Sequence, residues 1–91
     1  MNKKNLEARN KMRKELFDSI NNKDIEISSA LVKMRAVLNL SQQDFSKLVG
    51  ISKKIISDIE LNKGNPRVQT LNKIFAPLGL EVGLKAKTLK P

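Results

Sequence analysis

Four polar residues that can exchange hydrogen bonds with a partner are grouped near the middle of the chain. Lys53 and Lys54 are adjacent, and Ser57 and Asp58 follow about one helical turn later, so in a helix they share one surface. Lysine donates to acceptors such as guanine O6 and N7, and a carboxylate accepts from a cytosine amine. This set suits the reading of base edges in a DNA groove. The two lysines could instead contact phosphate or solvent, and Asp58 could simply repel phosphate.

Two short helices joined by a tight turn, within residues 41–61, would hold these four residues. Gly50 separates the two helical patterns and tolerates the left-handed backbone that such a turn needs. Ser41 and Ser52 stand where the helices begin, and a serine oxygen there accepts a hydrogen bond from a free backbone amide. The residues expected between the two helices are Phe45, Leu48, Val49, Ile51, Ile56 and Ile59. The pattern predicts a helix-turn-helix whose second helix is exposed.

Apolar residues at helical spacing predict three more helices, over residues 6–21, 29–38 and 68–78. Pro77 has no amide proton, so the last of these helices should kink or end early. Asn39 follows a predicted helix end, and asparagine tolerates a left-handed backbone better than most residues. The expected fold class is all-α, with four core helices and an extra amphipathic helix at the N-terminus.

The predicted N-terminal helix has an apolar stripe and a basic opposite face. The stripe consists of Met12, Leu16, Phe17 and Ile20. Two interpretations are open. The stripe can pack on the body of the domain or on a partner subunit while the charges are solvated, or the helix can be an arm that contacts DNA or another protein.

The C-terminal segment alternates apolar and other residues over positions 80–87, which is typical of a strand. A single strand leaves its amides and carbonyls unpaired, and the sequence has no second clear strand. The simplest neighbour is the same strand of a second copy, and an antiparallel pair would bury Leu80, Val82 and Leu84 between subunits. A frayed tail is the alternative. The chain divides into residues 1–27, the helix-turn-helix domain 28–79, and the strand and tail 80–91.

Composition excludes several classes of function. The 91 residues include no cysteine and no histidine, which removes disulfides, thiolate nucleophiles, histidine bases and most zinc sites. We therefore expect no enzyme activity, no metal and no cofactor. The sequence shows neither an apolar run long enough to cross a membrane nor a secretory signal, so we expect a cytoplasmic, nucleoid-associated protein. A domain this small has marginal stability alone, which favours a homodimer.

The net charge of +9 indicates a polyanionic partner, although charge alone does not separate nucleic acid from an acidic protein or membrane surface. Residues 1–23 contain seven basic and three acidic groups, residues 24–64 contain six and five, and residues 65–91 contain five and one. The helix-turn-helix segment is thus nearly neutral. Strong attraction to phosphate must come from a few placed residues and from the two ends of the chain.

Residues 30–80 resemble the Xre/Cro family of phage-repressor-like DNA-binding domains. The matching residues are Arg35, Leu40-Ser41-Gln42, Gly50, Ile56-Ser57, Glu60 and Asn65-Pro66. The resemblance implies a lambda-repressor-like fold and a buried ion pair between Arg35 and Glu60. Ser46 departs from the family pattern, which usually has alanine there, so its hydroxyl needs a hydrogen-bond partner or must face outward. Arg67 replaces the usual small cap, so the helix after it should begin less sharply.

The same resemblance implies contacts with the DNA backbone. In the family, the residue matching Gln42 clamps a phosphate at the start of the first helix of the pair, and Ser41 and Ser52 are candidates to assist it. Lys63 and Asn65, in the loop after the second helix, are the next phosphate candidates. Ordinary solvation is the alternative for the two loop residues.

The Leu-Gly-Leu-Glu junction at residues 78–81, followed by a C-terminal strand, is similar to the HipB branch of antitoxin repressors. That resemblance implies a homodimer that binds double-stranded DNA at an inverted-repeat operator, represses its own operon and neutralises a HipA-like protein toxin. HigA-like antitoxins and prophage or chromosomal Xre-type regulators without a toxin share the same body. A protein-interaction module with weak DNA binding is a further alternative.

Overall fold

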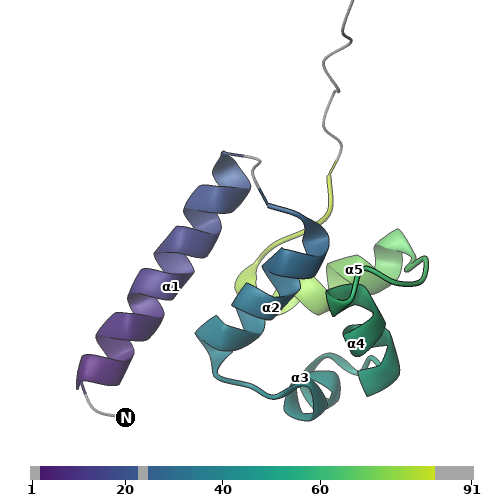
Figure 1. The fold of residues 1–91 in the computed structure, drawn as a ribbon, viewed down its shortest axis with the longest axis horizontal. Coiled ribbons are helices and arrows are strands. Elements are labelled where there is room, and N and C mark those ends of the chain that lie inside the picture. Colours follow the sequence, from purple (N-terminus) through teal and green to yellow (C-terminus); the bar gives the residue numbers. More distant parts are fainter. Residues whose placement is uncertain (1–2, 23–24, 84–91) are drawn as a thin grey trace, which may run out of the picture.

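The computed structural model describes residues 3–22 and 25–83, which form an all-α fold without a strand (Figure 1). Its α-helices are α1 (Lys3–Asn21), α2 (Ile27–Leu38), α3 (Gln42–Val49), α4 (Lys53–Glu60) and α5 (Val68–Phe75), and a 3₁₀ helix, η1, covers Ala76–Leu78. The predicted helices are all present. The helix-turn-helix consists of α3 and α4.

Local chemistry accounts for the ends of these helices. The Ser41 Oγ accepts a hydrogen bond from the amide of Asp44 at 3.0 Å, and the Ser52 Oγ accepts one from the amide of Ile55 at 3.3 Å. Both serines therefore cap their helices as predicted. Asn39 and Gly50 have φ values of 56° and 70°, which is the left-handed conformation that ends a helix.

The predictions for the last helix are also confirmed. The α-helix ends at Phe75, and the chain continues through Pro77 as a short 3₁₀ helix, because proline provides no amide for the α-helical bond. At the other end, Arg67 provides no side-chain cap for α5. The hydroxyl of Ser46, the unusual residue in α3, donates to the carbonyl of Ile51 and so has a partner.

One apolar core joins α1 to the other helices. Its buried members are Leu16, Ala30, Leu31, Met34, Val37, Phe45, Val49, Ile56, Ile59, Leu71, Ile74 and Phe75. Leu16 of α1 is 1% exposed, and Met12 and Ile20 pack against the same cluster. The Arg9 Nε also donates to the Val37 carbonyl in the last turn of α2 at 2.9 Å. The stripe of α1 thus packs on the body of the domain, as the first interpretation proposed.

The prediction that Leu48 lies between α3 and α4 is wrong, because its side chain is 57% exposed. Phe45 and Val49, four residues apart, already fill the buried side of α3. Leu48 is rotated by about 100° from Val49 along the helix and points outward.

The C-terminal segment packs against the core in this single chain. Leu80 and Val82 are partly buried against the apolar cluster, and the Val82 amide donates to the Asn72 Oδ1 at 2.7 Å. Residues 80–83 have no regular secondary structure. Leu84, the third residue of the predicted dimer strand, lies outside the described residues. The strand pair between two copies stays a prediction.

Candidate nucleic-acid interface

The helix pair α3 and α4 presents one polar face and buries the other. Ile56 and Ile59 of α4 are 0% and 4% exposed, and they pack in the same core as Phe45 of α3. The side chains of Lys53 and Lys54, at the N-terminal end of α4, are exposed. The core thus fixes the orientation of α4 and leaves its first turn open to a partner.

A partly buried ion pair holds the C-terminal end of α4 against α2. The Arg35 Nε lies 2.6 Å from the Glu60 Oε2, and an Arg35 terminal nitrogen donates to the Glu60 Oε1 at 2.7 Å. The side chains of Arg35 and Glu60 are 19% and 7% exposed. A second terminal nitrogen of Arg35 donates to the Leu40 carbonyl at 3.0 Å. This geometry agrees with the structural role that the family resemblance implied.

The surroundings of this pair favour its ionised form. Burial raises the pKa of the Glu60 carboxyl, but hydrogen bonds from Arg35 and Gln42, together with the charge of Arg35, outweigh burial and lower this pKa overall. The hydrogen bond to Glu60 raises the pKa of the Arg35 guanidinium, against the opposing effect of burial. Both groups are therefore charged at neutral pH.

Gln42 has a structural contact that the sequence did not reveal. Its Nε2 donates to the Glu60 Oε1 at 3.2 Å, so it joins the start of α3 to the end of α4. A side-chain amide has two N–H donors, and this bond uses one of them. The bond holds the side chain in the ion-pair network, and the phosphate contact predicted for Gln42 stays a prediction.

Within the predicted base-reading set, one lysine is already paired. The Lys54 Nζ lies 3.1 Å from the Asp58 Oδ2, one turn further along α4. The side chains of Lys54 and Asp58 are 84% and 34% exposed, so the pair is accessible and contributes at most about 1 kcal/mol to stability. Asp58 therefore offsets the charge of Lys54. Within the described residues Lys53 forms no ion pair, and Ser57 is half-buried.

The serines that cap α3 and α4 keep a donor for an anion. Each of Ser41 and Ser52 accepts a hydrogen bond from a backbone amide through its oxygen, which leaves the hydroxyl proton available. Both residues are exposed. The two helix starts thus combine a hydroxyl donor with the positive end of a helix dipole.

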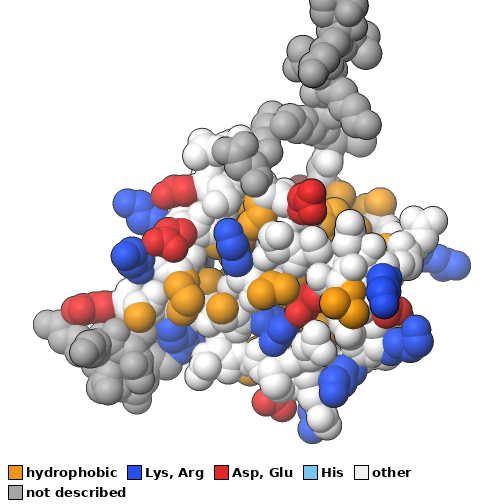
Figure 2. All heavy atoms as spheres, viewed as in Figure 1, with side chains coloured by type: hydrophobic (Ala, Val, Ile, Leu, Met, Phe, Trp, Pro, Cys, Tyr) orange, Lys and Arg blue, Asp and Glu red, His pale blue; other side chains and the backbone are white. Residues whose placement is uncertain are grey.

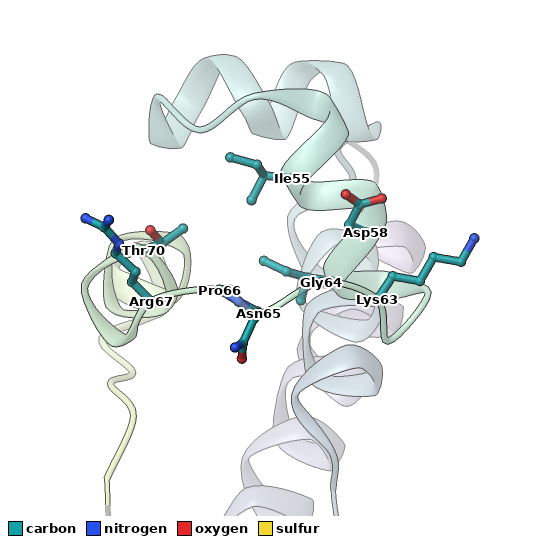
Figure 3. A pocket seen from close by; sticks show the side chains of 9 residues that line it. Ile55, Asp58, Lys63, Gly64, Asn65, Pro66, Arg67 and Thr70 are labelled. Carbon is teal, nitrogen blue, oxygen red and sulfur yellow. The ribbon is translucent and has the colours of Figure 1, made fainter.

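The predicted loop contacts, Lys63 and Asn65, line a groove between α4 and the start of α5 (Figure 3). Arg67 and Thr70 form the wall of this groove on α5. Ile55 lies on the opposite wall, on α4, and is exposed beside the polar face. Sequence reasoning missed Ile55 and Arg67 as members of this surface. Because Ile56 fills the core, the adjacent Ile55 points in another direction, and helical periodicity could have shown this.

Basic, acidic and apolar side chains share the visible face of the molecule. In Figure 2, Lys and Arg side chains are interspersed with Asp and Glu side chains, and a row of hydrophobic side chains runs across the middle of the face. In the described residues, no group of His, Cys, Asp and Glu side chains could hold a metal ion. The search for membrane spans in the described part of the chain found no helix that qualifies.

Comparison with known proteins decides the family. A family described as "Helix-turn-helix" matches residues 31–84, which is more than half of the chain. The chain belongs to the Xre-like helix-turn-helix family. This helix-turn-helix protein is also 31% identical over 74 residues to an "Uncharacterized HTH-type transcriptional regulator" of Haemophilus influenzae, with 77% of this chain and 76% of the relative covered. No solved structure matches the chain.

Proposed function

We propose that this helix-turn-helix protein is a sequence-specific DNA-binding transcriptional repressor. The observation that supports the proposal best is an exposed lysine at the start of a helix whose other side is packed against the rest of the domain. Lys53 is exposed in the first turn of α4, while the Arg35–Glu60 ion pair and the core hold the rest of that helix. A rigid helix with a free N-terminal turn can enter the major groove and place donors at base edges.

Each polar residue has a distinct role in this proposal. Lys53 and Lys54 donate to base acceptors, and Ser57 and Asp58 flank them one turn on. Lys54 exchanges its bond with Asp58 for a bond with DNA, or keeps it and holds Asp58 away from phosphate. The phosphate contacts come from the starts of α3 and α4 and from the loop that contains Lys63 and Asn65.

A homodimer would read an inverted repeat. Two copies of α4 related by a two-fold axis would sit about 34–36 Å apart and meet successive major grooves on one face of the duplex. The support for this assembly is the alternation of apolar residues over positions 80–87, which predicts a strand that would pair with the same strand of a second copy.

We further propose that the protein is the antitoxin of a toxin–antitoxin operon, which represses its own promoter and neutralises a HipA-like toxin. The support is the resemblance of residues 78–81 and the segment after them to HipB-type repressors. Co-expression with the product of an adjacent kinase-like gene would test it. Failure of the two proteins to co-purify would leave a regulator without a toxin, as in prophage or chromosomal members of the family.

The experiment that tests DNA binding measures affinity for a site selected from random duplexes by the full chain. We expect selected sites to be inverted repeats and binding to weaken with salt, because phosphate contacts release counterions. Lys53→Ala should weaken specific binding by about 1–3 kcal/mol if the lysine contacts a base. Lys33→Ala, an exposed lysine on α2, is the matched control and should bind as the wild type does. Selection of no common sequence would reject the proposal.

The alternative of a protein-interaction module loses its main support. The main evidence for such a module was the apolar stripe of α1. Leu16 of that stripe lies in the core, and Met12 and Ile20 pack against it. Phe17 is only partly buried, with the Arg13 guanidinium 5.5 Å from its ring centroid.

A further inference from the structure

An apolar side chain is exposed on the part of α4 where polar side chains that contact DNA bases are expected. Ile55 of α4 is 41% exposed, whereas the adjacent Ile56 is 0% exposed and belongs to the core. Ile55 lies next to Lys54 in sequence and three residues before Asp58, so it borders the polar face of the helix. Ile56 and Ile59 provide the core packing of α4, and Ile55 is not a member of the apolar core.

The surroundings of Ile55 show what kind of partner fits it. Ile55 lines the groove between α4 and the start of α5 together with Arg67 and Thr70. Lys63 also lines this groove, and its side chain points away from Ile55 (Figure 3). Asp58 also lines the groove, but its carboxylate is paired with Lys54. An apolar protein surface placed here would have to desolvate the cations Lys63 and Arg67. A polyanion that carries an apolar group satisfies both the cations and the isoleucine.

We infer that Ile55 contacts the C5-methyl group of a thymine in each half-site of the operator. This inference rests on the DNA-binding function proposed above. The major groove offers hydrogen-bond donors, acceptors and one apolar group, the thymine methyl. Lysines can donate hydrogen bonds to the base acceptors. The hydrocarbon side chain of Ile55 can make a favourable apolar contact only with the thymine methyl. Ile55 thereby selects thymine over cytosine, which lacks this methyl.

The test replaces thymine by deoxyuridine, which removes the methyl and keeps every hydrogen-bonding group. A duplex site is first selected from random sequences with the full chain, and each thymine is then replaced singly. We expect one thymine per half-site at which the wild type loses affinity about four-fold on replacement. This factor corresponds to the ~0.8 kcal/mol of one buried methylene-sized group.

The variants Ile55→Ala and Ile55→Val identify the residue responsible. With Ile55→Ala, affinity should be the same for thymine and deoxyuridine at that position, whereas Ile55→Val should keep part of the difference. Leu48→Ala, which removes a side chain that is 57% exposed on α3, should keep the full difference. Circular dichroism checks that each variant is folded.

Three results would overturn the inference. Deoxyuridine could be tolerated at every position by the wild type, or the loss could be unchanged in Ile55→Ala. Ile55→Ala could instead convert a dimer into a monomer in sedimentation, which would assign the side chain to a protein interface. Each result leaves the proposed repressor function standing, because a common selected sequence has already been found. Absence of any selected sequence rejects both.

Discussion

Replacement of Glu60 by glutamine is the sharpest test of how α4 is held in place. Glu60 accepts two hydrogen bonds from Arg35 and one from Gln42, and its side chain is 7% exposed. Glu60→Gln keeps the shape but leaves the Arg35 guanidinium without a counter-charge. Removal of one partner of a fully buried ion pair costs about 3–5 kcal/mol, and for this partly buried pair we expect a loss of about 1–3 kcal/mol. In a domain of this size each kcal/mol lowers the melting temperature by about 4–8 °C, so we expect a decrease of at least about 4 °C.

Far-UV circular dichroism in urea measures the free energy of unfolding, because the chain has no tryptophan or tyrosine for fluorescence. Asp58→Asn is the matched control, since it removes the carboxylate of an exposed pair on the same helix. It should cost less than about 1 kcal/mol. A loss below about 1 kcal/mol for Glu60→Gln as well would refute the argument that the Arg35–Glu60 pair is a buried structural element.

The pH dependence of stability gives an independent check on the same carboxyl. Its pKa is lower in the folded state than the ordinary value of about 4.3 in the unfolded chain. The unfolded state therefore binds more protons in the range between the two pKa values, and stability rises with pH there. The contribution of Glu60 is fully present above the unfolded pKa and is lost as pH falls through the folded pKa. Wild type and Glu60→Gln should differ in stability at pH 7 and converge as pH falls through the folded pKa of Glu60, and parallel pH profiles would contradict this.

Three further predictions concern the fold. Ser52→Ala removes the cap of α4 and should lower the free energy of unfolding by about 1 kcal/mol in urea titration; an unchanged midpoint would show that the cap bond is not formed in solution. Leu16→Ala should cost about 2–5 kcal/mol by the same assay, because Leu16 is 1% exposed, and no cost would mean that α1 is a free arm. Asn39→Ala should destabilise by about 1–2 kcal/mol while Asn39→Gly is tolerated, since position 39 has φ 56°; equal melting temperatures for the two variants would exclude a left-handed residue there.

The sequence by itself determined the local features of this protein. Side-chain oxygens at Ser41 and Ser52, the backbone freedom of Gly50 and the missing amide of Pro77 act within a few residues, so the boundaries of α3, α4 and α5 follow from residue types. The outward position of Lys53 also follows from helical periodicity, because Ile56 and Ile59 must face the core.

Only the tertiary structure decided which side chains meet across the fold. Leu48 has the apolar character of a core residue, but Phe45 and Val49 occupy the space against α4, so Leu48 is exposed. Gln42 joins the Arg35–Glu60 pair, although it lies 18 positions from Glu60 in the chain. The helix α1 packs against α2, whereas its sequence alone also allowed an arm. These outcomes depend on which side chains fill the one shared core and on contacts between residues far apart in the sequence. The spacing of apolar residues within a single helix does not predict either.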